Sequence, residues 1–435
     1  MCRTRLESAG AGASFFFSDG WKVLNDTQTQ RRRRVLYIVF LAAIAAVPPL
    51  ATDMYLAAMP TIATQWGVPD SHVALSLVLW FAGFSVFLLV CGPLSDKYGR
   101  RPVLLAGLIL FTAATGACAL ATNVVQLIVF RILQGIGAAG PSAMCMAICR
   151  DRYEGPQRKH ALAYIGIILG LAPMIAPMIG AALLKFAHWR AIFAVQGGLG
   201  LATLAISLRY VETATERVSG RILSLMGRYV VLMRNRRYFL TNTAMGLILG
   251  PFYGFIAFSS IVYIQIYELS NHAFSLLFGF NAAMGMLGAF VCTRVTRLVS
   301  DTVLLTVCLI GCVVGATGIL AWGSWHYLAF AGGMCLFTFF CGMSRPLSNN
   351  LILEQVRHDI GSASSFIVFY QFMVGAVCMR IATASWSRPI VAFGILAVLL
   401  PTVVLAFWPV LLRLLGTMPV SSAGPELSCV AGESK

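Results

Sequence analysis

Long, almost uninterrupted apolar runs are the feature that most restricts what this chain can fold into. A helix needs about 20 apolar residues to cross a hydrocarbon core roughly 30 Å thick, and the runs are long enough to do so. Of the 435 residues, 59% are hydrophobic and 11% are charged, whereas roughly 25% are charged in a typical soluble domain. In lipid only helices or closed barrels satisfy every backbone group, and these runs lack the alternation of barrel strands. The sequence therefore predicts an all-α membrane protein.

The apolar runs fall into two groups of six, separated by an Arg-rich polar stretch. We predict an N-terminal six-helix bundle over 35–210, a cytoplasmic linker over 211–238 and a C-terminal six-helix bundle over 239–413. This layout is typical of secondary transporters, whose substrate cavity lies between the halves near the midplane. The twelve predicted transmembrane helices are 36–64, 72–94, 102–121, 124–148, 161–184, 190–210, 239–262, 272–293, 303–322, 327–349, 360–380 and 387–412.

The basic residues follow the predicted membrane topology. With the N-terminus inside, cytoplasmic segments hold 26 of the 32 Lys and Arg residues, whereas outer segments hold four. This positive-inside bias predicts that both termini are cytoplasmic. The net charge of +16 thus belongs to membrane loops and does not indicate nucleic-acid binding. Residues 1–34 are predicted to be a disordered cytoplasmic leader, and residues 414–435 a cytoplasmic tail.

One carboxylate is predicted to lie deep inside a membrane span. Asp53, in the first helix, is the only acidic residue placed there, because the others fall at helix ends or in loops. A carboxylate held away from water can exchange protons at working pH. Asp53 is therefore the candidate for proton coupling. The alternative is structural, with Asp53 neutralising Arg131, and the two interpretations are compatible.

A charge of the opposite sign is predicted within the fourth helix. Arg131 lies about seven residues from the outer end, on the order of 10 Å into the membrane at 1.5 Å per residue. A buried charge is costly there unless it is paired or faces a wet cavity. Gln134 and Gly135 share its face, giving a polar stripe beside a small residue that lets another helix approach. The alternative is an arginine that snorkels to the interface.

The loop between the second and third predicted helices contains a tight, cation-rich turn. Its glycines permit close backbone approach, and a carboxylate stands among cations. The eleventh helix opens with small residues over 361–365, which leave a helix N-terminus accessible to an anion. The alternative is an ordinary basic loop. The residues of this motif are Gly92, Asp96, Lys97, Gly99, Arg100 and Arg101.

The fifth predicted helix combines prolines with glycines. Prolines four apart bend a membrane helix, and glycines allow tight packing of its neighbours. The alternative is a kinked packing helix without further function. The residues of this pattern are Gly170, Pro173, Pro177 and Gly180.

These four elements together resemble the major facilitator superfamily, and within it the Bcr/CflA branch of drug:proton antiporters. The resemblance covers most of residues 36–412, although Ala57, Ala176 and Ala181 replace a proline and two glycines of the branch's patterns. It implies the major facilitator fold in a bacterial inner membrane. It also implies export of chloramphenicol-type or bicyclomycin-type drugs in exchange for protons.

The same resemblance implies roles for individual residues. Asp53 and Arg131 take the positions of the branch's helix 1 acid and helix 4 arginine. Asp96 takes that of the aspartate thought to latch the halves against the dipole of the eleventh helix. Asp151 and Glu212, after the fourth and sixth helices, lie in segments that are also similar.

Polar side chains within the spans are candidates for the substrate cavity. Arg345 falls inside the tenth helix, where a cation facing the cavity would favour an anionic or zwitterionic substrate. The alternative is local pairing with backbone freed by Pro346. Asn281 and Gln371 are further candidates because polar amides avoid lipid, and Tyr55, near Asp53, completes the set.

Together these features predict a proton-coupled exporter of small molecules that works by alternating access. The alternative within transport is a dedicated exporter of an endogenous metabolite, for example an anionic siderophore or a nucleoside. A membrane enzyme or receptor would need a catalytic cluster or a sizeable extramembrane domain, and the sequence indicates neither. We expect no cofactor or metal, with protons as the coupling ion. We also expect a monomer whose partners are its small-molecule substrate and membrane lipid, with no nucleic acid.

Overall fold

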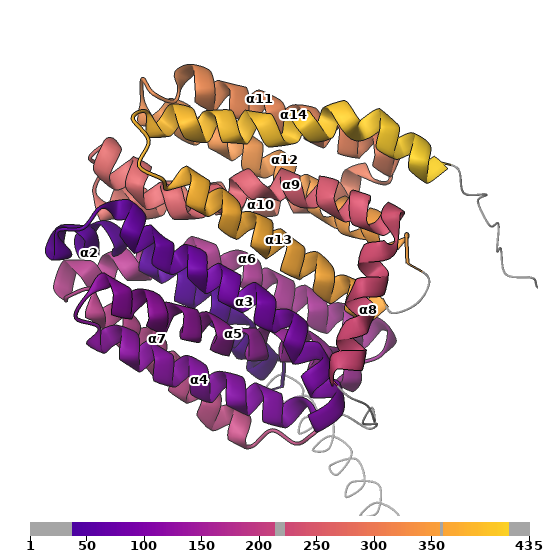
Figure 1. Cartoon of the computed structure of the whole chain (residues 1–435), viewed down its shortest axis with the longest axis horizontal. Coiled ribbons are helices and arrows are strands. Elements are labelled where there is room, and N and C mark those ends of the chain that lie inside the picture. The colour runs from indigo at the N-terminus through magenta and orange to yellow at the C-terminus, as the bar shows by residue number, and fades with distance from the viewer. Residues whose placement is uncertain (1–36, 214–221, 357–359, 417–435) are drawn as a thin grey trace, which may run out of the picture.

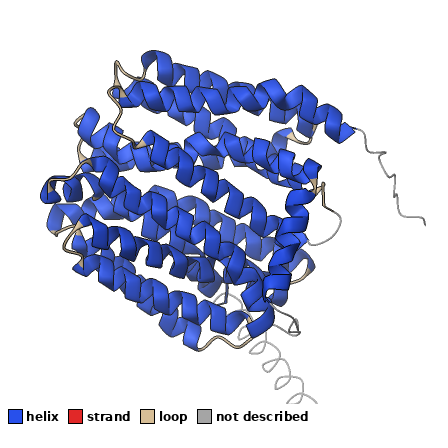
Figure 2. Ribbon diagram, in the orientation of Figure 1, coloured by secondary structure: helices blue, strands red, loops and turns tan. Residues whose placement is uncertain are grey.

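The computed structural model describes residues 37–213, 222–356 and 360–416, and this part of the chain is built from helices and their connections, without strands (Figures 1 and 2). The predicted leader over 1–34 lies outside the described residues. So does the predicted tail over 414–435, except for its first residues, which end the last helix.

Twelve helices in the described part of the chain are long and apolar enough to cross a membrane. This confirms the predicted fold class. The spans are Tyr37–Leu56, α3 (Asp70–Tyr98), α4 (Arg100–Leu120), α5 (Val124–Arg152), α6 (Gly155–Phe186), α7 (Arg190–Leu208), α9 (Arg236–Ser260) with η1 (Ile261–Ile266), α10 (Asn271–Val295), α11 (Asp301–Trp322), α12 (Tyr327–Leu353), α13 (Ile360–Ala382) and α14 (Pro389–Gly416).

The first span is broken, so the continuous helix predicted over 36–64 is wrong. The helix Tyr37–Leu56 ends in a short turn, and α2 (Met59–Trp66) follows it. Pro60 has no N–H to donate to the carbonyl of Leu56, and its ring would collide with that carbonyl in a continuous helix. The turn is fully buried in protein, which is where irregular backbone is tolerated at membrane depth.

The seventh span is irregular at a corresponding place. α9 continues directly into η1, a π-helical segment with wider backbone hydrogen bonding. Each half therefore begins with a span whose second part, towards its C-terminal end, departs from a continuous α-helix. These two irregular parts, α2 and η1, contact one another across the halves.

Two pairs of helices form most of the contact between the halves in the described residues, α3 with α13 and α6 with α10. Figure 1 shows α3 and α13 side by side at the front of the molecule. In the other pair, a Cβ built on Gly170 would lie 2.7 Å from the sulfur of Met286, and one on Gly279 would lie 3.2 Å from the carbonyl oxygen of Met174. The halves thus meet through glycines and flexible Met side chains, which can repack when helices shift.

A short helix within the predicted linker crosses the ends of the spans. α8 (Ile222–Arg234) runs across the bundle, at the right of Figure 1. The Tyr229 hydroxyl donates to the Leu89 carbonyl of α3 at 3.1 Å, and the Tyr229 ring stacks on Phe366 of α13. Burial raises the pKa of the Tyr229 hydroxyl to about 12, so it remains a donor at neutral pH. α8 therefore contacts both halves.

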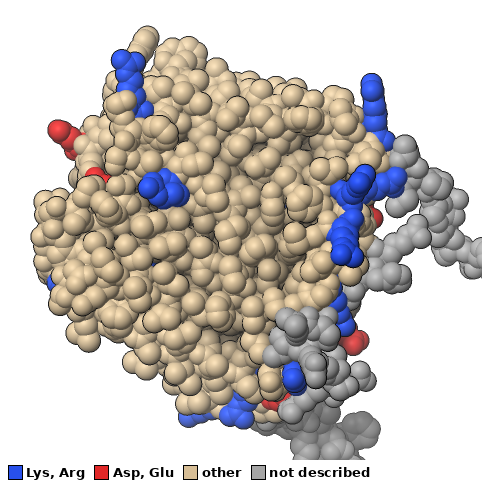
Figure 3. Space-filling model, viewed as in Figure 1, with Lys and Arg blue, Asp and Glu red and all other residues tan. Residues whose placement is uncertain are grey.

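Basic side chains gather around α8. In Figure 3 most of the blue Lys and Arg atoms on the visible face lie at this end, and a broad uncharged belt covers the middle. We call this end, which also carries the segment from Gly92 to Arg101, the basic end. The loop predicted for this segment is wrong in extent, because α3 continues to Tyr98 and Gly99 alone separates it from α4. The far end carries α2 (Figure 1).

Packing of α6 against the first span can be tested with two glycines of the same helix. A Cβ on Gly180 would lie 2.3 Å from the carbonyl oxygen of Met54, whereas nothing lies within 4 Å of a Cβ on Gly166. We expect Gly180→Ala to lower the free energy of unfolding by about 1–3 kcal/mol through overpacking. Gly166→Ala should leave it unchanged. Thermal unfolding in detergent measures both variants, and equal melting temperatures would contradict the close contact.

Candidate functional site

A cavity of about 640 Å³ lies between the two halves. It extends from Asp53 in the middle of the bundle to Asp96 and Arg228 at the basic end. Its volume is within the range of small-molecule sites, about 300–1,000 Å³. Aromatic side chains from both halves form much of its wall: Trp80, Phe81, Phe84, Tyr253, Phe255, Phe278 and Phe372.

Direct contacts between the halves close the far end. The Gln265 side-chain amide of η1 donates to Asp70 of α3 at 2.5 Å. The hydroxyls of Ser71 and Ser385 lie 3.3 Å apart. None of these four residues lines the cavity, which therefore reaches the basic end and not the far end.

Asp53 lies on the cavity wall, just before the break in the first span. Its side chain is 5% exposed, and its Oδ1 accepts a hydrogen bond from the Thr52 hydroxyl at 2.9 Å. No ion pair joins Asp53 to Arg131 in the described residues. The alternative in which Asp53 neutralises Arg131 is therefore not the arrangement in this structure.

Arg131 is fully buried in the N-terminal half and does not line the cavity. Its Nη1 donates to the Ala51 carbonyl at 3.1 Å and to Gln134 Oε1 at 2.5 Å. Its guanidinium carbon lies 4.4 Å from the centre of the Tyr55 ring, a cation–π contact. The snorkelling alternative is wrong, because the side chain reaches no interface.

Part of the guanidinium has no partner. Arg131 Nε and Nη2 make no hydrogen bond among the residues described here. Leaving buried donors of a charged group unbonded is costly. The Arg131 guanidinium is therefore held by the Ala51 carbonyl, the Gln134 amide and the Tyr55 ring, while its Nε and Nη2 groups remain unbonded.

Sequence reasoning missed Gln196, which completes the surroundings of Arg131. Gln134 Nε2 donates to the Thr115 hydroxyl at 2.8 Å and to Gln196 Oε1 at 3.2 Å. Gln196 Nε2 in turn donates to the Ala51 carbonyl at 3.2 Å. An amide within the otherwise apolar sixth span was the signal available in the sequence, because polar amides avoid lipid.

Gly135 brings α3 close to α5. A Cβ on Gly135 would lie 2.4 Å from the Trp80 carbonyl oxygen. The absent side chain lets Trp80 lie within 5.7 Å of the Arg131 guanidinium and also reach the cavity. The small residue thus places one aromatic ring between the buried cation and the cavity.

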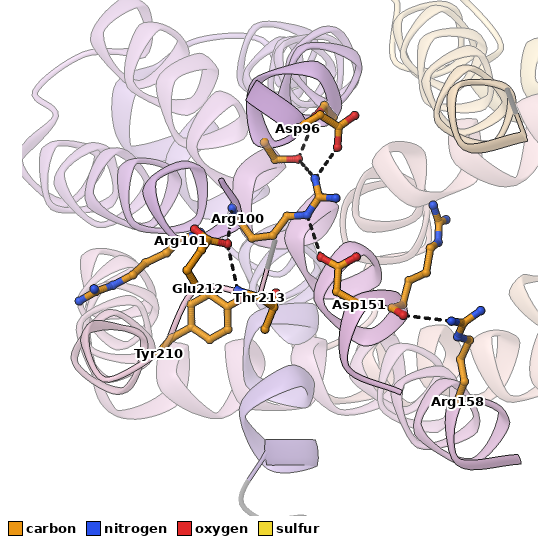
Figure 4. Close-up of polar contacts among 11 residues, drawn as sticks. Asp96, Arg100, Arg101, Asp151, Arg158, Tyr210, Glu212 and Thr213 are labelled. Atoms are coloured by element: carbon orange, nitrogen blue, oxygen red, sulfur yellow. Dashed lines mark hydrogen bonds and ion pairs between the residues drawn. The ribbon is translucent and has the colours of Figure 1, made fainter. Parts of the chain in front are cut away.

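At the basic end, Arg100 connects three segments of the N-terminal half (Figure 4). Its Nη1 donates to Asp96 and to the Ser95 hydroxyl, both at 2.6 Å, and its Nε donates to Asp151 of α5 at 3.0 Å. Networks of this kind fix geometry better than an isolated surface pair. The junction of α3 and α4 at Gly99 is thereby tied to the end of α5.

Glu212 holds the start of α4. Its carboxylate accepts hydrogen bonds from the backbone N–H groups of Arg100 at 2.9 Å and Arg101 at 3.0 Å (Figure 4). Such groups at a helix N-terminus have no partner within the helix and favour an anion. Gly99 has φ 102° and a Cβ there would lie 2.4 Å from Glu212 Oε2, so only glycine fits.

The remaining cations of the loop motif make local contacts. The Lys97 ammonium lies 5.4 Å from the centre of the Tyr98 ring, and Arg101 donates to the Leu208 carbonyl at 2.9 Å. Asp96 lines the cavity together with the first turn of α13, but its bond is to Arg100. The predicted contact between Asp96 and the eleventh helix is not present in this structure, because the carboxylate is held by its own half.

Some of the residues predicted from the sequence to line the cavity do so. Asn281 and Arg345 line the cavity, as do Gly92 and Pro173 from the two motifs.

Tyr55 and Gln371 do not line it, so their assignment to the cavity is corrected. The Tyr55 hydroxyl hydrogen-bonds to Ser76 inside the N-terminal half, and Gln371 donates to Asn349 of α12. Both polar groups are directed at neighbouring helices. Of the fifth-helix pattern, Gly170 and Gly180 pack against Met286 and Met54.

A family model described as Major Facilitator Superfamily matches residues 41–379. The chain belongs to the major facilitator superfamily. Among relatives, an uncharacterized MFS-type transporter, YdgK, of Bacillus subtilis (strain 168) is 31% identical over 355 residues, which cover 80% of this chain and 88% of that protein. A bicyclomycin resistance protein homolog of Haemophilus influenzae is 28% identical over 80% of this chain and 89% of its own length. The multidrug transporter MdfA of Edwardsiella ictaluri is 26% identical over 83% of this chain and 90% of its own length.

Solved structures support the major facilitator fold. A bacterial homolog of the human lysosomal transporter Spinster, in an inward-facing and occupied conformation, matches with TM-score 0.68 and 14% identity, covering 87% of this chain and 97% of that one. A D-xylose-proton symporter matches with TM-score 0.64 and 13% identity, covering 85% and 96%. At this identity the likeness concerns the fold alone.

The amide network of this major facilitator can be tested by a double-mutant cycle. Gln134→Leu and Gln196→Leu should each lower the free energy of unfolding by about 1–3 kcal/mol, because each leaves buried polar partners unbonded. The double variant should lose less than the sum of both, since the two amides bond to one another. Thermal unfolding of the four proteins in detergent measures the coupling. Strict additivity would contradict a shared network.

Proposed function

We propose that this protein is a proton-coupled secondary transporter that exports small molecules by alternating access. The observation that carries the proposal is one cavity between two six-helix halves, with a buried carboxylate, Asp53, on its wall. The cavity reaches one end of the bundle, while contacts such as Asp70 with Gln265 close the other. A site that is accessible from one side at a time is what alternating access requires.

Proton coupling rests on Asp53. Its carboxylate is buried and has no ion-pair partner in the described residues, so its protonation state changes the local charge directly. Arg131 lies nearby in the same half, bonded to Ala51 and carrying unbonded N–H groups. We propose that proton release from Asp53 changes its interaction with this cation and with the substrate, and so favours one orientation of the halves.

The basic end supplies the second element of the cycle. When the halves close there, we propose that Asp96 leaves Arg100 for the N-terminus of α13, the function implied for the latch. Arg100 would keep Asp151 as its partner. Asp96 and the start of α13 line the same cavity, so closing of the halves at this end would bring them together.

The orientation and substrates follow from charge and from relatives. We propose a location in the bacterial inner membrane with the basic end in the cytoplasm, since basic loops are retained there. Relatives are named as multidrug transporters and as a bicyclomycin resistance protein homolog, and the aromatic wall suits drug-like molecules.

We propose protons as the only coupling ion, with no further cofactor. A single chain supplies both halves of the cavity, which supports a monomer.

The assignment of Asp53 predicts proton release from purified protein in detergent. Adding a transported drug should release protons into a weakly buffered solution, and Asp53→Asn should abolish the release and uphill export without reducing expression. The control is Asp301→Asn, which removes an exposed carboxylate at a helix end outside the cavity. Uphill export by the Asp53→Asn variant would contradict the assignment of Asp53 to proton coupling.

The planar guanidinium of Arg131 predicts a loss on replacement by lysine. The lysine ammonium lacks the planar face that lies over Tyr55 and the fixed fork of donors that reaches Ala51 and Gln134. We expect Arg131→Lys to reduce the rate of transport at least about tenfold, the effect of losing one charged hydrogen bond. Arg190→Lys is the matched control, because Arg190 also lies over a ring and donates to a carbonyl, outside the cavity. Full activity of Arg131→Lys would contradict the proposed role.

A further inference from the structure

Arg345 places a fixed positive charge on the cavity wall. It belongs to α12, in the C-terminal half, and its side chain is exposed to the cavity rather than buried among helices. Asp53, from the N-terminal half, lines the same cavity. The two halves therefore contribute formal charges of opposite sign to one space.

The Arg345 guanidinium has no partner in the described part of the chain. No hydrogen bond or ion pair involves it there, and its charge acts only at longer range on the Tyr253 hydroxyl and the Cys341 thiol. The predicted alternative of pairing with backbone near Pro346 is therefore not present. A cation at membrane depth is tolerated where it is paired or faces a wet cavity, and Arg345 faces the cavity with its donors available to an anionic ligand.

A second unsatisfied polar group lies on the same side of the cavity. Asn281 of α10 is 3% exposed, lines the cavity, and its Oδ1 has no hydrogen-bond partner among the described residues. α10 and α12 are pressed together, since a Cβ on Gly342 would lie 2.2 Å from the Gly285 carbonyl oxygen. This packing holds together the two helices that carry Asn281 and Arg345, and both residues belong to the wall that the C-terminal half contributes to the cavity, which we call the polar wall.

Aromatic rings adjoin this polar wall. The Tyr253 ring lies 5.2 Å from Phe372 and 6.0 Å from Phe81, centre to centre, and Trp80 stacks on Phe84 at 5.2 Å. These rings come from both halves and line the cavity. They offer planar apolar surface for an aromatic ligand, whose ring they would contact in offset or edge-on geometry.

We propose that the cavity binds amphoteric aromatic molecules, with a carboxylate on Arg345, a protonated amine toward Asp53 and the planar ring against the aromatic wall. A guanidinium binds a carboxylate through two parallel hydrogen bonds, which gives specificity as well as affinity. Asn281 adds an acceptor for a donor group of the ligand. This inference rests on the proposed function, because it concerns the transport cavity, and it narrows the substrate class from drug-like molecules to aromatic zwitterions.

The test compares two probes that differ in one charge. Norfloxacin is an aromatic carboxylic acid with a basic piperazine ring, and its ethyl ester keeps the ring and the amine but lacks the carboxylate. Equilibrium binding to the full-length protein in detergent should favour the acid over the ester by roughly ten- to a hundredfold, the effect of losing hydrogen bonds to a charged group. Arg345→Gln should weaken binding of the acid to the level of the ester and leave the ester unchanged. Arg345→Lys should lie between them.

Binding of the ester by Arg345→Gln shows that the variant is folded. Arg388→Gln is the matched control for a lost positive charge, since Arg388 is exposed and lies outside the cavity; it should change neither affinity. Equal binding of acid and ester by the unaltered protein, or an equal loss of both in Arg345→Gln, would overturn the inference. If both probes bind and release protons through Asp53 without preference, this inference alone fails. If neither probe binds and no drug releases protons, the proposed function fails with it.

Discussion

Hydrocarbon offers no hydrogen-bond partner to a polypeptide, and the arrangement of this protein follows from that constraint. Every described span is helical, because a helix satisfies its own backbone. The break before Pro60 is fully enclosed by protein, and η1 contacts α2 across the interface of the halves. The irregular backbone thus lies where the halves pack against one another. Both irregular segments belong to the far end, where the halves are in direct contact.

The two arginines at membrane depth, one in each half, have different surroundings. Arg131 is enclosed in the N-terminal half by Gln134, Gln196 and an aromatic ring, so its charge contributes to the architecture of that half. Arg345, in the C-terminal half, has no such enclosure and meets the cavity instead. The partners of Arg131 are side chains and backbone of its own half, whereas the donors of Arg345 are available to a ligand.

The polar contacts at the two ends differ in which parts of the protein they join. At the far end Asp70 and Gln265 connect one half to the other. At the basic end Arg100, Asp151 and Glu212 bond within the N-terminal half. Contacts within a half hold that half rigid without closing the cavity, whereas contacts between halves close it. A transporter of this design changes its access by exchanging one kind of contact for the other.

Much of the fold could be predicted from the sequence, because each span must satisfy its own backbone from local residues. The apolar runs predicted twelve helices, and the break in the first of them was missed although Pro60 was visible. A proline often bends a membrane helix without ending it, so its effect depends on the packing around it. The position of charged residues within spans was equally readable, which is why Asp53, Arg131 and Arg345 could be singled out.

The neighbours of these residues were decided only by the tertiary structure. The sequence alone could not place Gln196 beside Gln134 or direct Tyr55 and Gln371 away from the cavity. It also could not show that Asp53 and Arg131 make no ion pair. Such contacts join helices far apart in the chain, and their geometry depends on how closely glycines let those helices approach. The sequence by itself determined which segments cross the membrane and which charges lie within it, because these follow from the free energy of transfer of each segment. Which of those charges face protein and which face the cavity was decided by packing, because a side chain's partner depends on the position of another helix.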